Sequence, residues 1–354
     1  MAATKVQDVL LVGYGAVGAI YALVLQRSGL VRVTAVARSN YDAVQEHGFR
    51  IESTKYGVIN GCRPDRILRS VAAAADRAYS YVFIASKAIP ERVATPAILK
   101  PLISAPYVDE YPQPTYVILQ NGLGVETDLY HSIKDIGKEP SIVSTALWVN
   151  TNLLQPNVAE HGNLNRLIIG VYRHNDFTTV TNTPTEAALL EDLSAVLTAG
   201  GTDVIIAPDV QRHKFSKNFW NVAFSSFSTL TRYRLPALFR EPPSDPSKPY
   251  TPYVSPTTAH LIKEYTIPAI RATLAELVVL ARALGYPDSR DGIPSTLPDE
   301  VIENTRKLHV GPESFHKPSM MIDAEKDQPI EVEVIFGAVV RLAQERGVSL
   351  PVSI

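Results

Sequence analysis

The stretch VLLVGYGAVG, residues 9–18, decides how the chain begins to fold. Its first four residues are apolar and predict a short buried strand, and the apolar residues of the following segment, residues 19–27, recur at helical spacing. Between the two lie the letters GYGAVG, which match the G-x-G-x-x-G pattern, and a second β-branched run follows at residues 31–37. This order of strand, glycine-rich turn, helix and strand predicts a βαβ unit that binds a dinucleotide at the N-terminus of its helix.

The glycine-rich turn is the predicted phosphate-binding segment. Gly13 permits the tight turn, Gly15 lets the backbone approach a pyrophosphate, and Gly18 lets the helix pack on the strand. The helix N-terminus adds free N–H groups and a partial positive charge. We therefore expect the coenzyme to contact the whole turn, which comprises Gly13, Tyr14, Gly15, Ala16, Val17 and Gly18. A tight glycine turn without a ligand is the alternative interpretation.

The end of the second predicted strand bears on which dinucleotide is bound. An NAD-binding protein usually places Asp or Glu there to hold the ribose 2′-hydroxyl, whereas this chain has Ala37, Arg38, Ser39 and Asn40. The guanidinium of Arg38, with hydroxyl and amide donors beside it, suits a 2′-phosphate. The sequence therefore favours NADP(H) over NAD(H) as the cofactor. An arginine that only caps the strand or faces solvent is the alternative.

The rest of the chain separates into a strand-rich part and a helical part. Continuous apolar runs are typical of buried parallel strands, and such runs occupy residues 81–85, 116–119, 142–149 and 167–171. Helical periodicity dominates later, over residues 210–231, 258–284 and 330–346. The predicted fold class is α/β, with a Rossmann-type doubly wound sheet in an NADP-binding domain, residues 1–207, and an all-helical substrate-binding domain, residues 208–354. Prolines gather at residues 236–256, which predicts a surface insert between two helices.

Composition excludes several classes of protein. Of the 354 residues, 45% are hydrophobic and 20% are charged, which is a globular composition. A formal net charge of -2 provides no overall basic field, so we expect a small-molecule substrate and neither a nucleic acid nor a membrane as partner. Cys62 is the single cysteine and the eight histidines are scattered, so we expect no metal site and a reducing, cytoplasmic location.

A row of polar residues in the helical part is the candidate reacting group. His213, Lys217, Asn221 and Ser225 lie four residues apart in an otherwise apolar and aromatic stretch, so on a helix they share one face. If a coenzyme delivers hydride to a ketone, a lysine suits the developing alkoxide, because it donates a proton or supplies a fixed positive charge. Asn221, one turn on, is placed to hydrogen-bond the substrate or the nicotinamide ribose. A solvated polar face is the alternative.

Polar residues near the end of the chain form a second candidate group. The hydroxyl of Ser319 suits a substrate carboxylate, and the carboxylate of Glu331 suits a substrate hydroxyl. Taken alone, Ser319 and Asp323 also fit turn and capping positions. Glu331 taken alone fits the first turn of a helix, where the macrodipole favours an acid.

In the order and spacing of its motifs, the sequence resembles the ketopantoate reductase (2-dehydropantoate 2-reductase) family over most of the chain. The motifs that carry the resemblance are Gly13–Gly18, Arg38, Lys87 in IASK, Asn121 in QNGLG, Glu160–Gly162, Lys217, Asn221, Ser319, Asp323 and Glu331. The resemblance implies a Rossmann domain, a helical C-terminal domain, and NADPH-dependent reduction of a 2-oxo acid, as in pantothenate biosynthesis. It also suggests a homodimer.

The resemblance further implies a role for each matched residue. Lys217 would be the general acid, and Asn221 and Glu331 would complete the catalytic set by positioning the substrate. The substrate-binding residues would be Ser319, which meets the carboxylate, together with Lys87 and Asn121. These last two match family positions near the nicotinamide end of the cofactor, so they would bind cofactor as well.

Two other interpretations of the same fold stay open from the sequence. A biosynthetic enzyme of this kind would act on a bulkier ketone or imine, or would catalyse a non-redox rearrangement around a structural coenzyme, and the proline-rich insert motivates this interpretation. A non-catalytic NADP(H)-binding sensor is the other. Such a sensor needs the glycine-rich turn but not the combined presence of Lys217, Asn221, Ser319 and Glu331.

Overall fold

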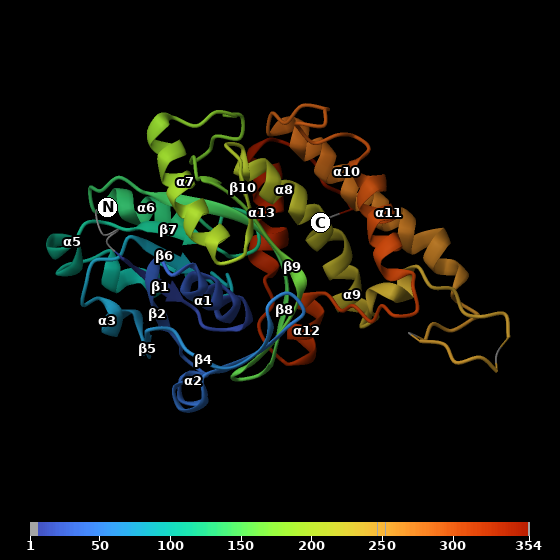
Figure 1. The fold of residues 1–354 in the computed structure, drawn as a ribbon. Coiled ribbons are helices and arrows are strands. Elements are labelled where there is room, and N and C mark those ends of the chain that lie inside the picture. Colours follow the sequence, from blue (N-terminus) through green and yellow to red (C-terminus); the bar gives the residue numbers. More distant parts are fainter. Residues whose placement is uncertain (1–5, 246, 252, 353–354) are drawn as a thin grey trace. The chain divides into compact units, whose positions relative to one another are not determined.

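The computed structural model describes residues 6–245, 247–251 and 253–352, which form two compact units (Figure 1). The first unit ends at His213 and the second begins at Lys214, so the division falls within helix α8 (Val210–Trp220). All strands of the described chain belong to the first unit, and the described part of the second unit is built from helices. The predicted fold class, an α/β domain followed by a helical domain, is confirmed.

A ten-stranded mixed sheet forms the framework of the first unit. Its strands are β1 (Gln7–Val12), β2 (Val31–Val36), β3 (Phe49–Ser53), β4 (Gly57–Cys62), β5 (Arg66–Leu68), β6 (Tyr81–Ile84), β7 (Thr115–Ile118), β8 (Ile142–Gln155), β9 (Val158–Val171) and β10 (Asp203–Ile206). Across the sheet they follow the order β4-β3-β9-β8-β7-β6-β1-β2-β5, and β10 pairs with β9. The segment from β7 through β6, β1 and β2 to β5 is entirely parallel, as in a doubly wound sheet.

One prediction about the sheet is confirmed only in part. The apolar runs at residues 142–149 and 167–171 predict parallel strands, but β8 and β9 pair antiparallel and are joined as a long hairpin. With their other neighbours both strands are parallel, since β8 pairs in parallel with β7, and β9 pairs in parallel with β3 and with β10. A strand that is covered on both faces is apolar throughout whichever way its neighbour runs, so an apolar run predicts burial and not direction.

The helices of the first unit pack around this sheet. They are α1 (Ala16–Ser28), α2 (Tyr41–His47), α3 (Val71–Ala74), α4 (Thr95–Leu99), η1 (Lys100–Leu102), α5 (Tyr107–Glu110), α6 (Thr127–Asp135), α7 (Pro184–Ala199) and the start of α8. Helices α1 and α7 contact each other and the strands, and Ile20, Val24 and Leu193 share one buried cluster with Val33 and Val143 of the sheet. This cluster holds the start of α1 against the end of β1, where the glycine-rich turn lies.

The second unit contains the three helical segments that periodicity predicts. Its helices are the end of α8, η2 (Asn221–Ser225), α9 (Ser226–Thr231), η3 (Leu235–Leu238), η4 (Ile262–Thr266), α10 (Ile267–Ala283), α11 (Leu297–His309), α12 (Ser319–Glu325), η5 (Glu333–Gly337) and α13 (Ala338–Glu345). Each predicted segment also contains a five-residue π-helical turn, namely η2, η4 or η5, which the sequence does not predict. Among the described residues, no helix has the length and apolar character needed to span a membrane.

Candidate functional site

The glycine-rich turn lies where backbone segments approach too closely for a side chain. Gly13 has a φ of +98°, and a Cβ on it would lie 2.4 Å from the backbone nitrogen of Ser86. A Cβ on Gly18 would lie 2.0 Å from the carbonyl oxygen of Gly13. These two glycines are therefore required by the fold itself. A Cβ on Gly15 would meet no atom of the described residues within 4 Å, so Gly15 leaves open space beside the turn.

Helix α1 presents free backbone donors at this turn. Its first ladder bond runs from the N–H of Ala19 to the carbonyl of Gly15, at 2.8 Å, so the N–H groups of Ala16, Val17 and Gly18 come before the ladder. In the part of the chain that the structure describes, no side chain caps this helix, and its first turn has no acidic residue. The turn therefore combines open space with the positive end of a helix, which suits a pyrophosphate.

Tyr14 differs from the rest of the turn because its side chain belongs to the core. The ring is 2% exposed and packs edge-on against Phe49, with ring centroids 4.8 Å apart. The carbonyl of Tyr14 accepts a hydrogen bond from Nδ2 of Asn40 at 2.7 Å, and Asn40 also donates to the carbonyl of Pro156 at 3.0 Å. Arg38, two residues before Asn40, is exposed at the end of β2. These contacts join the glycine-rich turn to the segment that carries Arg38.

Strands β6 and β7 place Lys87 and Asn121 on the same edge of the sheet. The strands are parallel with Ile84 opposite Ile118, so both residues lie three positions beyond paired strand ends. Gln120 connects the two ends, since its Nε2 donates to the carbonyl of Ser86 at 3.0 Å. Strand β1 ends opposite Ile84 as well, so the glycine-rich turn shares this edge. Doubly wound sheets bind their ligands at this carboxyl edge.

Lys217, in the last turn of α8, has an altered acidity. Burial lowers the pKa of its ammonium group from 10.5 to about 8; the carboxylate of Glu331 opposes this effect and the like charge of Lys214 adds to it. Glu331 and Lys214 are only 8% and 6% exposed. A solvated polar face would leave its side chains covered by water, whereas Lys217 is half-buried and its charged neighbours Lys214 and Glu331 are buried. Glu331 lies directly before the helical segment that begins at Val332.

Two π-helical turns adjoin Lys217 and Glu331. Turn η2 continues α8 directly, η5 begins two residues after Glu331, and the two turns contact each other. Asn218 of α8 joins that helix to η5, because it is 3% exposed and its Nδ2 donates to the carbonyl of Ile335 in η5 at 3.0 Å. A π-helical turn is wider than an α-helical one and is frequent at functional sites.

The π-helical turn changes the predicted polar row. Because the helix widens at Asn221, Ser225 does not continue the row, and it is 2% exposed inside the unit. His213 accepts a hydrogen bond from Arg212 at 3.0 Å, and burial lowers its pKa. Lys217 and the half-buried Asn221 therefore remain as the candidates from this row.

Lys214 and Asn218 are two buried polar residues beside Lys217 that the sequence pattern does not predict. Both lie in the aromatic stretch that drew attention to Lys217, and both are buried polar residues. They lie three residues before and one residue after Lys217, so they do not share the four-residue spacing of His213, Lys217, Asn221 and Ser225. Burial was the property that would have identified them, and the sequence pattern alone does not give it.

Ser319 is the first residue of α12 and is exposed. Pro318 and not Ser319 occupies the N-cap position, so the capping interpretation of Ser319 is wrong. Asp323 lies one turn further along the same helix. Helix α12 contacts η2, the turn that begins with Asn221, so Ser319 and Asn221 belong to neighbouring elements of the second unit.

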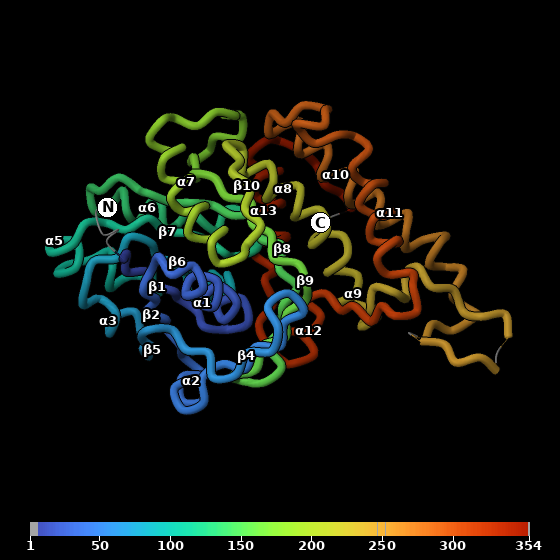
Figure 2. Tube along the Cα trace, viewed as in Figure 1, coloured from blue at the N-terminus to red at the C-terminus, as the bar shows by residue number. Residues whose placement is uncertain are grey.

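The proline-rich insert, residues 236–256, is anchored by Arg240. Figure 2 shows it in orange as a loop that extends beyond the end of α9, although its first residues lie in the short buried helix η3. The guanidinium of Arg240 donates to the carbonyl of Thr251 within the insert and to three carbonyls of the loop after α11, those of Val310, Gly311 and Ser314. This loop leads to Ser319, so the insert and the candidate substrate segment are joined through Arg240.

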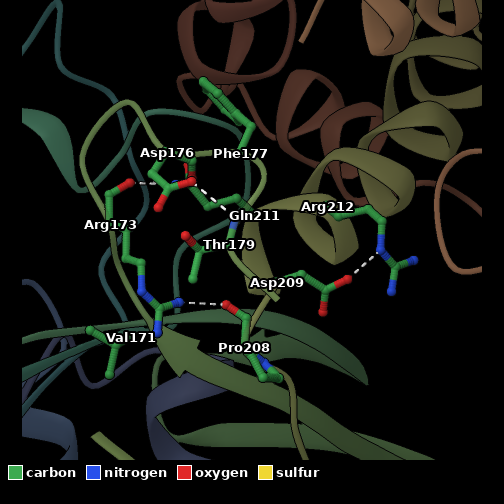
Figure 3. A pocket seen from close by; sticks show the side chains of 9 residues that line it. All are labelled: Val171, Arg173, Asp176, Phe177, Thr179, Pro208, Asp209, Gln211 and Arg212. Carbon is green, nitrogen blue, oxygen red and sulfur yellow. Dashed lines mark hydrogen bonds and ion pairs between the residues drawn. The ribbon is translucent and has the colours of Figure 1, made fainter. Parts of the chain in front are cut away.

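A small cavity in the first unit lies beside the start of α8, lined by residues of the β9–α7 loop (Figure 3). Arg173 donates to the carbonyl of Pro208 at 2.7 Å and to Glu186 at 2.9 Å, and Gln211 donates back to the carbonyl of Arg173 at 2.6 Å. The volume of about 10 Å³ holds about one water molecule, so this cavity is a polar joint and not a substrate site. In the described ranges, no three His, Cys, Asp or Glu side chains are grouped to hold a metal ion.

Comparison with known proteins identifies the family. Residues 9–174 match the family described as "Ketopantoate reductase PanE/ApbA", and residues 248–353 match "Ketopantoate reductase PanE/ApbA C terminal". The chain is 27% identical to an uncharacterized protein of Saccharomyces cerevisiae (97% of this chain, 89% of that protein). It is 24% identical to the 2-dehydropantoate 2-reductase of a Nostoc species (96% and 90%).

One solved structure with a similar fold contains NADH. It is D-mandelate dehydrogenase in a ternary complex with NADH and anilino(oxo)acetate, with a TM-score of 0.72, 17% identity, and coverage of 98% of this chain and 94% of that chain. At this identity the likeness extends to the fold alone. From the two matched segments, this chain belongs to the ketopantoate reductase family, whose members are oxidoreductases that use a nicotinamide coenzyme on small carbonyl substrates.

Proposed function

We propose that this protein is an NADPH-dependent reductase of a 2-oxo acid, with ketopantoate as the first substrate to test. The observation that carries the proposal is the depressed pKa of Lys217 beside Glu331. A lysine with a pKa of about 8 is both charged and a competent proton donor near neutral pH. Family membership supplies the expectation of a nicotinamide coenzyme, and the glycine-rich turn supplies a place for its pyrophosphate.

The residues of the first unit fit a dinucleotide. The open space at Gly15 is the cradle that a Cβ would fill, and the N–H groups of Ala16 and Val17 are available beside it. Arg38 would hold the 2′-phosphate, which favours NADP(H), and Lys87 and Asn121 would lie near the nicotinamide. When bound, the coenzyme supplies a hydride to the carbonyl carbon of the substrate. Because a relative of this fold binds NADH, the choice between the two coenzymes is part of the test.

The residues of the second unit would complete the reduction. The ammonium group of Lys217 donates a proton to the carbonyl oxygen as that oxygen becomes an alkoxide, which gives the 2-hydroxy acid and a neutral lysine. Glu331 favours the protonated form of Lys217 and accepts a hydrogen bond from the substrate hydroxyl. Asn221 orients the carbonyl, and the hydroxyl of Ser319 donates to the substrate carboxylate. Solvent then reprotonates Lys217.

The proposal is tested by following the absorbance of NADPH and of NADH in the presence of protein and ketopantoate. We expect oxidation of NADPH, with a lower kcat/KM for NADH, and formation of the 2-hydroxy acid. Absence of oxidation above background at high protein concentration would exclude ketopantoate as the substrate.

A bulkier carbonyl substrate is the second candidate, and the anchored insert favours it. Arg240 holds the insert against the segment that leads to Ser319, and an element at the candidate substrate segment can alter the substrate range. The same assay with larger 2-oxo acids, ketones and imines tests it, and product analysis without NADPH separates reduction from a non-redox rearrangement. Coenzyme binding with no turnover of any of these compounds would support a sensor instead.

The acidity of Lys217 predicts how the reaction depends on pH. Only the protonated lysine donates, and its pKa is about 8, so kcat/KM should be constant below pH 7 and fall above pH 8, about tenfold for each further unit. A profile from pH 6 to pH 10 measures this. The matched variant is Lys217→Arg, whose guanidinium stays protonated throughout, so its lower activity should not fall above pH 8. A wild-type profile that is flat to pH 10 would contradict the assignment.

A further inference from the structure

Arg38 and Arg69 follow the carboxyl ends of two neighbouring strands, β2 and β5. Strand β5 pairs with β2 in parallel, with Leu68 opposite Val36, and the next N–H along β2, that of Ala37, donates to the carbonyl of Leu68 at 2.9 Å. Arg38 and Arg69 each follow this last bonded pair by one position. Two arginines that follow neighbouring strands therefore lie at adjacent positions of the carboxyl edge of the sheet, beside the glycine-rich turn.

Arg69 is held in one orientation by the start of α2. Its guanidinium carbon lies 3.9 Å from the centroid of the Tyr41 ring, and its Nη2 lies 2.5 Å from Oδ1 of Asp42. Tyr41 in turn donates its backbone N–H to the carbonyl of Arg38 at 3.2 Å. The ring therefore fixes the plane of the Arg69 guanidinium close to the segment that carries Arg38.

The ion pair between Arg69 and Asp42 is exposed enough for another anion to displace the carboxylate of Asp42 from the guanidinium. The two side chains are 62% and 83% exposed, and an ion pair this exposed adds little to stability. A phosphate monoester carries a charge of about −1.5 to −2 and three acceptor oxygens, and it matches the fork of a guanidinium better than one carboxylate does. Asp42 thus occupies the anion position on the Arg69 guanidinium.

We propose that Arg69 is a second cation of the subsite for the coenzyme's 2′-phosphate, and that Asp42 is its competing partner when no coenzyme is bound. This inference rests on the proposed use of NADP(H). Arg38 and Arg69 together bind the phosphate monoester, Tyr41 orients Arg69, and Asp42 lowers the affinity by competing for the same guanidinium. Replacing Arg69 would remove a donor and should weaken binding of the 2′-phosphate. Replacing Asp42 would remove a competitor and should strengthen it.

The test measures binding and not turnover. Calorimetric titration of the purified full chain with 2′,5′-ADP and with 5′-AMP isolates the 2′-phosphate. We expect Arg69→Ala to weaken 2′,5′-ADP at least tenfold, Asp42→Asn to strengthen it severalfold, and both to leave 5′-AMP unchanged. The matched control is Arg50→Ala, which removes an exposed arginine of similar pairing, with Glu52, on β3 near the opposite edge of the sheet. It should change neither affinity.

The outcomes separate this inference from the proposed function. Unchanged binding of 2′,5′-ADP by Arg69→Ala, in a protein that still prefers it to 5′-AMP, overturns the role of Arg69 alone. Weaker binding by Asp42→Asn overturns the competing role of Asp42, because that carboxylate would then be positioning Arg69. Equal affinity of the unaltered protein for the two nucleotides overturns the NADP(H) assignment and this inference with it. If the variants bind 2′,5′-ADP as expected but the protein reduces no 2-oxo acid, the role of Arg69 stands and the proposed reaction is overturned.

Discussion

Replacing Lys217 with alanine should lower kcat by at least about a hundredfold while the affinity for NADPH stays unchanged. The reason is the loss of the only proton donor assigned to the alkoxide, in surroundings whose low polarity already lowers the pKa of this lysine to about 8. The ground-state contacts assigned to the substrate, from Ser319 and Asn221, remain, so KM should change much less than kcat. Steady-state kinetics and a fluorescence titration with NADPH give the two quantities.

Two further variants separate chemistry from folding. Lys217→Met keeps the aliphatic stem of the side chain and removes only the proton donor, so it should lose as much activity as the alanine variant. Lys138, an exposed lysine of the first unit, provides the control, and Lys138→Ala should retain full activity. Activity of Lys217→Met near that of the unaltered protein, with a normal unfolding transition, would remove Lys217 from the mechanism.

The parts of the fold that the sequence predicts well are those with local causes. The letters from Val9 to Gly18 predict a strand, a turn and a helix because Gly13 and Gly18 each answer a steric requirement between closely approaching segments, and β1 and α1 confirm this. The three helical segments are predicted because one face of each is buried, which gives the apolar residues a helical period. The proposed boundary between residues 207 and 208 stays a prediction.

The parts that the sequence does not predict depend on contacts between distant segments. The antiparallel pairing of β8 and β9 depends on which strands become neighbours, and the apolar residues of each strand do not determine this. The π-helical turns η2 and η5 contact each other, so each depends on a segment about a hundred residues away in the chain. Asn218 and Lys214 are prominent only once burial is known. The same holds for Arg69, which appears as one of several surface arginines until β5 places it beside Arg38.

Replacing Gly15 with alanine should abolish most coenzyme binding without harming the fold. A Cβ at this position meets no atom of the described chain within 4 Å, and the backbone of Gly15, with φ of -89° and ψ of -156°, is accessible to alanine. The unfolding free energy should therefore stay the same or rise by about 0.4–1 kcal/mol, because alanine restricts the unfolded chain. The added methyl group would occupy the space where the pyrophosphate approaches, so the affinity for NADPH should fall at least about tenfold.

Gly13→Ala is the matched comparison, because it should have the opposite pattern. Its backbone has a φ of +98° and its Cβ would lie 2.4 Å from the nitrogen of Ser86, so the substitution should destabilise the fold by about 1–3 kcal/mol. Chemical denaturation and NADPH titration of both variants measure the two effects separately. If Gly15→Ala bound NADPH as tightly as the unaltered protein, the open space beside Gly15 would not be the pyrophosphate site. The glycine-rich turn would then be a purely steric device, needed at Gly13 and Gly18 to bring α1 against β1 and β6.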